Sequence, residues 1–216
     1  MKREIITTAD GSNTIHIPEW NEQYHSKHGA IQEAYHVFIR NGLEQISKEN
    51  IAILEIGFGT GLNCLITLLE SNKTIHYIGV EAYPVALEEL KKLNYTDNLN
   101  GKNKANYFQV IHACPWDVKQ QISKQFSLTK QKKFFQEITD VNTYDLIYFD
   151  AFGARVQPEL WTEKIFTIMY NSLRENGILV TYAAKGTIRR AMIAVGFSVE
   201  RLPGPPGKRE MLRATK

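Results

Sequence analysis

The sequence predicts an α/β protein built on a mostly parallel, doubly wound sheet, with an antiparallel hairpin at its C-terminal edge. From residue 51 onward, short apolar runs that suit buried strands alternate with segments whose apolar residues recur at helical spacing. Such alternation is typical of strand–helix–strand units, whose right-handed crossovers put helices on both faces of a parallel sheet. A Pro/Gly corner at 203–207 then separates two short segments, which indicates a closing hairpin.

The predicted elements follow one another along the chain. Strands are expected at 51–56, 74–80, 107–112, 144–150 and 177–184, and the hairpin at 197–202 and 208–215. Helices are expected at 62–70, 84–93, 118–126, 162–173 and 186–196. Pro84 suits a helix start and Thr162 suits a helix cap.

The first 50 residues differ from the rest. A polar, looser arm precedes a single helical stretch at 29–43. We therefore expect residues 1–50 to form an arm and helix that pack on a core at 51–216, with one structural domain overall. From the composition of this arm, we hypothesise that it acts as a lid.

The composition excludes several classes of protein. Of the 216 residues, 43% are hydrophobic and 23% charged, which is ordinary for a globular domain. No run approaches the ~18 apolar residues of a membrane span, and the N-terminus lacks a signal-peptide core. Cys64 and Cys114 form no CxxC pair, and the histidines form no metal motif, so we expect no metal and a cytoplasmic location.

The charge is unevenly spread along the chain. Residues 151–216 hold eleven Lys or Arg against five Asp or Glu, a formal charge of +6, which leaves −3 for residues 1–150. A basic face would attract a polyanion such as RNA. A solvated surface that merely favours Lys and Arg explains the same numbers equally well.

A glycine-rich loop follows the first predicted core strand. It places Gly57, Gly59 and Gly61 two residues apart, directly after Glu55. A dinucleotide fingerprint would need its third glycine at position 62, which is Leu62. The G-x-G-x-G pattern instead resembles the first motif of class I, Rossmann-like methyltransferases, which implies S-adenosylmethionine as cofactor.

Further side chains around this loop are candidates for the same ligand. Glu81 ends the second strand, where an acid can accept hydrogen bonds from both ribose hydroxyls. Phe58 lies within the loop, and Glu55 either contacts the ligand or only braces the loop. Asn63 either contacts the methionine carboxylate or caps the helix.

Asp150 ends the fourth predicted strand, so it faces the same crevice at the strand tips. A carboxylate there can orient an amine and stabilise the positive charge that builds on nitrogen during methyl transfer. An alkylamine has a pKa near 10.4 and is mostly protonated at neutral pH, so we assign Asp150 orientation first and proton acceptance second. A helix cap or loop brace is the alternative.

Several segments together resemble one family, the methyltransferase domain of MnmC and the stand-alone MnmD enzymes. They are GFGTGLN (57–63), DAFGARVQPELW (150–161), GTIRRAMIAVGF (186–197) and GKREML (207–212). The resemblance runs from about Tyr24 to the C-terminus. It implies N-methylation of the 5-aminomethyl group of wobble (2-thio)uridine, with the anticodon stem-loop of tRNA as substrate.

The resemblance also suggests residue roles. The family's glycine loop, ribose acid and strand-four acid correspond to the glycines at 57, 59 and 61, to Glu81 and to Asp150. Its N-terminal motif resembles Tyr24, Ser26, Gly29 and Glu33. The expected contacts to substrate or tRNA are Tyr24, Phe152, Trp161, Arg189, Arg190, Lys208 and Arg209.

The chain departs from the family pattern at three places. Phe152 is followed by Gly153 and Ala154 where the family has Phe-Ala-Pro, and Gln-Pro replaces Asn-Pro at 157–158. Where the family has Gly-Asp after strand three, we align Ala113 and Cys114, so adenine recognition is expected from backbone groups of Cys114 to Trp116. We expect no flavin-binding half, because the sequence stops at residue 216, and we therefore expect a separate enzyme to supply the aminomethyl substrate.

Two other functions remain open. A methyl- or aminopropyltransferase acting on a small free amine would share the sheet and the strand-four acid, although such sites favour several acids and the +6 segment argues against one. A non-catalytic RNA-binding module would keep only the fold, which the retained glycines, Glu81 and Asp150 argue against.

Overall fold

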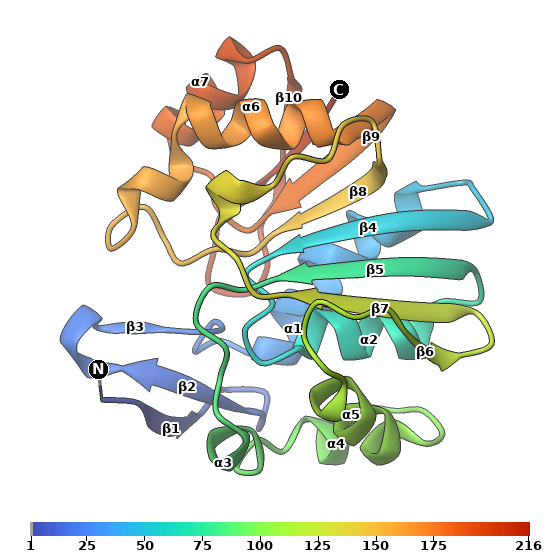
Figure 1. Cartoon of the computed structure of the whole chain (residues 1–216). Coiled ribbons are helices and arrows are strands. Elements are labelled where there is room, and N and C mark those ends of the chain that lie inside the picture. The colour runs from blue at the N-terminus through green and yellow to red at the C-terminus, as the bar shows by residue number, and fades with distance from the viewer. Residues whose placement is uncertain (1) are drawn as a thin grey trace.

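A large mixed sheet forms the centre of the molecule, as a computed structural model describes for residues 2–216 (Figure 1). Its strand order is β10-β11-β9-β8-β4-β5-β7-β6. The five strands from β9 to β7 in that order run parallel, whereas β6, β10 and β11 pair antiparallel. The bounds are β4 Asn50–Ile56, β5 Thr74–Val80, β6 Gln120–Ser123, β7 Phe126–Gln131, β8 Tyr144–Phe149, β9 Leu173–Thr181, β10 Ser198–Pro203 and β11 Glu210–Thr215. The predicted α/β class and the closing hairpin are confirmed.

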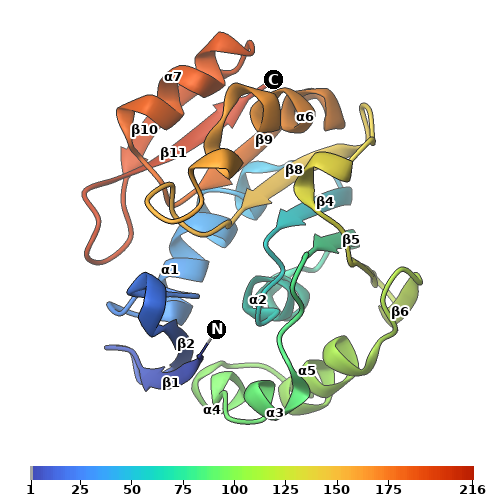
Figure 2. The same ribbon diagram turned by 60° about the vertical axis from the view of Figure 1, so that its left-hand side comes forward.

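Helices cover both faces of this sheet (Figures 1 and 2). One face carries α1, α2 and α5, and the other carries α6 and α7. The bounds are α1 Ala30–Ala34, continued by a π-helical stretch at Tyr35–Arg40, α2 Leu62–Glu70, α3 Leu87–Leu90, α4 Tyr95–Asn98, α5 Lys104–Ala113, α6 Glu163–Ser172 and α7 Gly186–Ala194. No helix in residues 2–216 is long and apolar enough to cross a membrane.

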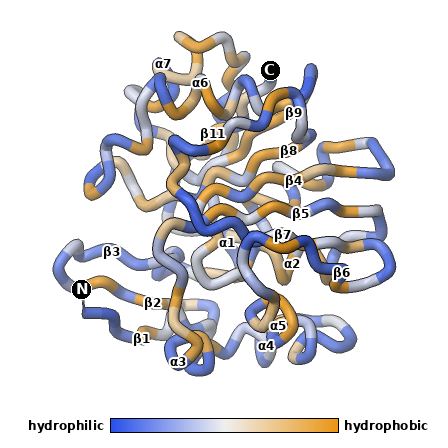
Figure 3. The backbone as a smooth tube through the Cα atoms, viewed as in Figure 1, coloured by the Kyte–Doolittle hydropathy of each residue, from blue (hydrophilic) through white to orange (hydrophobic). Residues whose placement is uncertain are grey.

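Strand β4 shows how the sequence selects these two layers. Ile51 and Ile53 belong to the apolar cluster on the α2 side, whereas Leu54 and Ile56 belong to the cluster on the α6 side. Side chains of a strand alternate between faces, so a continuous apolar run fits a strand that is covered on both sides. The hydrophobic band across the central strands is visible in Figure 3.

The N-terminal segment forms a second, smaller sheet rather than a loose arm. Its three antiparallel strands are β1 Glu4–Thr7, β2 Asn13–Ile17 and β3 Glu22–Gln23, with a 3-10 turn at Pro18–Trp20. Ile15 from β2 is fully buried in the same apolar cluster as Ala30 of α1. The small sheet thus lies beside the carboxyl ends of the central strands (Figure 1).

Two sequence predictions were wrong in the middle of the chain. Residues 107–112, expected as a strand, belong to helix α5, and residues 118–126, expected as a helix, contain strand β6 and the start of β7. The third parallel strand is therefore β7. Ser127 and Lys130 are buried polar residues at 3% and 2% exposure, and they break the apolar run that would have marked this strand.

Two smaller differences concern helix ends. Helix α3 covers only Leu87–Leu90 of the predicted 84–93, so Pro84 lies before the helix and not in its first turn. Thr162 does precede α6, but its side chain makes no capping hydrogen bond. Its hydroxyl donates instead to the Glu159 carbonyl at 3.2 Å.

Candidate active site

The glycine loop joins β4 to α2 and turns sharply against the end of β5. Gly57 and Phe58 both donate their backbone N–H groups to the Val80 carbonyl at 3.0 Å. Gly57 has φ +84°, and a Cβ there would stand 2.8 Å from the Asp150 carbonyl oxygen. Only glycine fits this conformation and this close approach, so the loop is a backbone cradle open to a ligand.

Glu81 holds the loop from the end of β5. One carboxylate oxygen accepts the Gly59 N–H at 3.1 Å, and the other accepts the Tyr83 N–H at 2.9 Å. Each oxygen retains lone-pair capacity for a further donor such as a ribose hydroxyl. Glu81 therefore lies where the sequence prediction put it, beside the glycine loop.

A single asparagine joins the acid before the loop to the acid after β8. The Asn63 amide nitrogen donates to Glu55 at 3.0 Å and to Asp150 at 2.9 Å. Glu55 and Asn63 are buried, and burial raises the pKa of Glu55 well above its usual value. Oδ1 of Asn63 lines the pocket described below and has no partner within residues 2–216, and such a buried acceptor favours a ligand that donates to it. Glu55 is not among the residues that line this pocket, so it braces Asn63 from the core side.

Asp150 lies at the tip of β8, with its N–H bonded to the Ile56 carbonyl at 2.9 Å. Burial, followed by the nearby Glu33 carboxylate, raises the pKa of Asp150 to about 7, while the Asn63 hydrogen bond and Lys208 act in the opposite direction. A carboxyl group with this pKa changes protonation state near neutral pH. It is suited to bind an amine and to exchange a proton with it.

One large pocket of about 990 Å³ lies at the carboxyl edge of the sheet, and its lining includes Asn63, Glu81 and Asp150. The pocket is lined by the glycine loop, by 81–83 after β5, by 134–136 after β7 and by 150–153 after β8. The N-terminal segment 20–28 and the hairpin turn at 207–208 close the opposite side. A ligand pocket at this edge is what the parallel sheet leads one to expect.

Aromatic side chains from two distant segments form one wall of the pocket. The ring of Phe152 lies edge-on to Tyr24 at 5.0 Å and to Trp20 at 5.5 Å between centroids. Tyr24 also covers the glycine loop, because a Cβ on Gly59 would stand 3.2 Å from its ring. Apolar rings beside a carboxylate suit a planar base that carries an amine.

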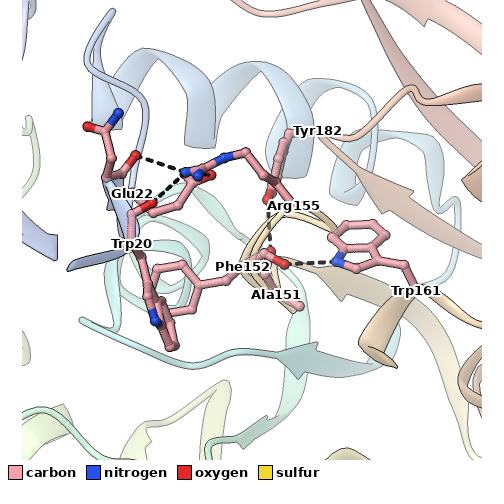
Figure 4. A network of polar contacts seen from close by, with 8 residues as sticks. Trp20, Glu22, Ala151, Phe152, Arg155, Trp161 and Tyr182 are labelled. Carbon is pink, nitrogen blue, oxygen red and sulfur yellow. Dashed lines mark hydrogen bonds and ion pairs between the residues drawn. The ribbon is translucent and has the colours of Figure 1, made fainter. Parts of the chain in front are cut away.

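The loop after β8 is braced from behind by two hydrogen bonds (Figure 4). The Tyr182 hydroxyl donates to the Ala151 carbonyl, and the Trp161 indole N–H donates to the Phe152 carbonyl, both at 2.8 Å. Trp161 is 5% exposed and packs in the core under α6. It therefore supports the pocket wall without lining the pocket.

Of the four basic residues predicted to meet RNA, the structure brings only Lys208 into the pocket. Lys208 forms an ion pair with Glu33 at 2.6 Å and lies 3.8 Å from the centre of the Tyr182 ring. The other three basic side chains lie outside the pocket lining, on α7 and the hairpin turn: Arg189, Arg190 and Arg209.

Cys114 and Trp116 are not in this pocket. They follow helix α5 instead of the third strand, and they line a separate cavity of about 190 Å³ behind Phe58. The alignment that pointed to them rested on the misassigned strand at 107–112. The residues that do follow the third parallel strand include Phe134 and Gln136, which line the large pocket.

Sequence reasoning also missed Tyr83, Phe134, Trp20 and Arg155 at this site. The Phe-Phe pair at 134–135 could have indicated the pocket, but only if the strand that precedes it, β7, had been predicted correctly. Trp20 and Arg155 come together through long-range contacts that no local pattern reveals.

A Rossmann-like sheet with a glycine loop, a ribose-type acid and a strand-four acid around one pocket defines a methyltransferase-type nucleoside site. A family model described as S-adenosyl-L-methionine-dependent methyltransferase matches residues 103–216. The chain belongs to this family of S-adenosyl-L-methionine-dependent methyltransferases, and the glycine cradle, Glu81 and the unpartnered Oδ1 of Asn63 fit that cofactor.

The predicted resemblance to the MnmC methyltransferase region is confirmed. The chain is 29% identical to the tRNA 5-methylaminomethyl-2-thiouridine biosynthesis bifunctional protein MnmC of Cupriavidus metallidurans over 96% of its length. It is 28% identical to the protein of the same name from Marinomonas sp. over 91% of its length. The match covers 33% and 31% of those proteins, so the chain spans about a third of the curated relatives it matches.

Solved structures agree with this assignment. MnmC2 from Aquifex aeolicus superposes with a TM-score of 0.80 at 25% identity, over 99% of this chain and 70% of that one. Spermidine synthase from Thermotoga maritima gives 0.64 at 14% identity, over 99% of this chain and 68% of that one. The match to spermidine synthase shows only that the two proteins share a fold.

Proposed function

We propose that this chain methylates the 5-aminomethyl group of the wobble (2-thio)uridine of tRNA, using S-adenosylmethionine and yielding 5-methylaminomethyl-(2-thio)uridine. The observation that carries the proposal is the Asn63 amide, which joins Asp150 to Glu55, the acid at the end of β4 just before the glycine loop. This bridge places an amine-binding carboxylate next to the cofactor cradle. The names of the MnmC relatives supply the substrate.

The cofactor side of the pocket follows from the loop geometry. The loop from Gly57 to Gly61 would receive the methionine part, and Glu81 the ribose hydroxyls. Beyond Glu81, exposed Tyr83 and Phe134 lie edge to face at 6.0 Å, so we place the adenine against this pair. When bound, S-adenosylmethionine supplies an electrophilic methyl group on a positively charged sulfur.

Asp150 has two tasks in the proposed reaction. The Asn63 amide donates a hydrogen bond to Oδ2 of Asp150, which leaves Oδ1 of Asp150 to accept an N–H of the substrate amine. The carboxylate then stabilises the positive charge that grows on nitrogen as the new N–C bond forms. Its raised pKa of about 7 narrows the gap to an alkylamine from roughly 6.5 pKa units to roughly 3.4, so Asp150 is a better proton acceptor than an ordinary carboxyl group.

The substrate side suits an unpaired base. Tyr24, Trp20 and Phe152 offer ring faces and edges beside Asp150, and RNA-binding proteins read splayed-out bases by stacking them on such rings. Exposed Arg190 and Arg209 would contact RNA phosphates outside the pocket. Because the substrate tRNA must already carry the aminomethyl group, the proposal includes a second enzyme that installs this group. It also places the protein in the cytoplasm.

The decisive experiment identifies the methylated product. The protein is incubated with S-adenosylmethionine labelled on its methyl group and with tRNA from cells that lack this methylation, and the tRNA is digested to nucleosides. Label in 5-methylaminomethyl-(2-thio)uridine supports the proposal. Label in free polyamines added to a parallel reaction would favour a small-amine transferase, and retained RNA with no label anywhere would favour a binding module.

A further inference from the structure

The loop that carries Asp150 and Phe152 lacks the proline of the related family and has Gly153 and Ala154 in its place. Nothing in the local sequence fixes the conformation of such a loop. In the structure, the next residue, Arg155, reaches across to the N-terminal sheet (Figure 4). Its Nη2 donates to the Trp20 carbonyl at 2.6 Å, to the Asn21 carbonyl at 3.0 Å and to Glu22 Oε1 at 2.9 Å.

These contacts join the two halves of the aromatic wall. Trp20 and Tyr24 come from the N-terminal segment, and Phe152 comes from the loop after β8. Tyr182 and Trp161 hold the loop to the core, whereas Arg155 links it to the N-terminal sheet. The rings of the two halves touch, so the wall keeps its shape only while these two segments stay together.

We propose that Arg155 is a positioning residue that fastens the N-terminal sheet to the loop after β8 and so holds in place the aromatic wall against which a planar pyrimidine base lies beside Asp150. The inference rests on the proposed function for the identity of the base. The fastening itself rests on the three contacts of Nη2.

The chemistry of arginine suits this task. A surface ion pair with Glu22 alone would contribute little, because water screens it. Two of the three acceptors are backbone carbonyls, so the guanidinium holds the path of the chain as well as one side chain. Lysine would keep the charge and offers three N–H donors on one nitrogen, but its Nζ is one bond closer to the backbone than Nη2, so it should substitute only in part.

The test compares R155A, R155K and E22Q with R201A as a matched control. The side chains of Arg155 and Arg201 are 53% and 52% exposed, and each pairs with one glutamate, but Arg201 lies on β10 in the closing hairpin. Three quantities are measured for each variant: hydrogen exchange of backbone amides, KM for the tRNA, and the Kd of S-adenosylhomocysteine.

Specific amides report on the loop. The N–H groups of Val156 and Gln157 bond to the Gly153 carbonyl at 3.0 and 3.2 Å, whereas the N–H of Asp150 bonds to β4 and serves as the internal reference. In R155A we expect exchange at Val156 and Gln157 to quicken about tenfold and KM for tRNA to rise about tenfold, with the Kd for S-adenosylhomocysteine within about twofold of wild type, because the contacts of this half-exposed side chain together contribute roughly a tenfold change. R155K should fall between, E22Q should be milder still, and R201A should match wild type.

The outcomes separate this inference from the function. An active wild-type enzyme whose R155A variant keeps the same exchange rates and the same KM would overturn the inference alone. Equal effects of R155A and R201A would also overturn it, because they would show a general charge effect. A wild type that methylates no tRNA, combined with faster exchange in R155A, would overturn the proposed function and keep the fastening role. If R155A does not fold, R155K and E22Q decide the question by the same measurements.

Discussion

The two sides of the pocket are built in different ways. On the cofactor side, the glycine loop is held by backbone hydrogen bonds to Val80 and by the buried pair of Glu55 and Asn63. On the substrate side, the wall is held by exposed Arg155, which bonds to residues 133 to 135 positions away in the sequence. One side is therefore fixed by local chain geometry, and the other by long-range side-chain contacts.

This difference suggests a division of labour. The buried, backbone-held side can receive the same cofactor in any enzyme of the family. The side-chain-held wall can change its width and chemistry through a few surface residues, and loops that carry function are often of this kind. The predictions below test whether changes on one side leave the other unaffected.

The largest effect is expected for D150N, at the centre of the pocket. The amide keeps the shape of the carboxylate but can neither stabilise the growing charge nor accept a proton, so kcat should fall on the order of 10³-fold. Because Asp150 does not belong to the cofactor cradle, the Kd of S-adenosylhomocysteine should stay within about threefold of wild type. An equal loss of both would move Asp150 to the cofactor side.

D150N should also stabilise the protein. The pKa of Asp150 is raised in the folded state to about 7, so its ionised form costs stability at and above neutral pH, and the cost shrinks as the pH falls from about 7 towards the ordinary value of 3.8. Removing the charge should raise the free energy of unfolding at pH 8 by on the order of 1–4 kcal/mol. A fall in Tm would show that the activity loss came from misfolding.

G57A should damage the cofactor side. The new Cβ would stand 2.8 Å from the Asp150 carbonyl, at φ +84°, so the loop must move. We expect the Kd of S-adenosylhomocysteine to rise about 10- to 100-fold and stability to drop by about 1–3 kcal/mol from the strained conformation. Calorimetric titration and thermal unfolding measure the two effects.

G153A is the matched control on the substrate side. A Cβ there would meet nothing closer than 3.8 Å, and Gly153 does not need positive φ. Cofactor affinity and Tm should therefore stay at wild-type values. If G153A lowered cofactor affinity and Tm as much as G57A, both loops would be intolerant of a side chain. The two sides of the pocket would then not differ in the way proposed.

The sequence predicted the cofactor side because its requirements are local. Glycines at fixed spacing, an acid at the end of the second strand and Asp150 at the end of the fourth are all visible in short windows, and the structure brings them together around one pocket. The same reasoning failed for Cys114 and Trp116. Buried Lys130 interrupted the true third strand, while the β-branched and aromatic residues of α5 imitated one.

The substrate side could be predicted only in part. Tyr24 and Phe152 came from the family resemblance, and the structure shows them in contact. Trp20 and Arg155 could not be found, because their partnership depends on how the small N-terminal sheet docks against the central one. No spacing rule encodes that docking.

The pH profile of kcat/KM tests how Asp150 is tuned. The amine needs the ionised carboxylate, so kcat/KM should fall about tenfold per pH unit below the Asp150 pKa of about 7. Glu33 raises that pKa by charge repulsion, while Lys208 and the Asn63 hydrogen bond lower it. E33Q removes the repulsion and frees Lys208 from its ion pair, and both changes should move the acidic limb to lower pH. A limb that moves to higher pH, or that stays in place, contradicts this account.

The smallest effect is expected for W161F, which removes one brace behind the substrate wall. The phenyl ring keeps most of the packing but leaves the Phe152 carbonyl without the indole N–H that now lies at 2.8 Å. Loss of one such hydrogen bond costs about 1 kcal/mol, so KM for tRNA should rise about two- to fivefold while cofactor affinity stays unchanged. W116F is the control for the substrate side, because Trp116 lines a small cavity that shares only Phe58 and Gly59 with the pocket, so KM for tRNA should stay unchanged. A W116F variant with weakened cofactor binding would return adenine recognition to the segment from Cys114 to Trp116 and would extend the cofactor side beyond the pocket described above.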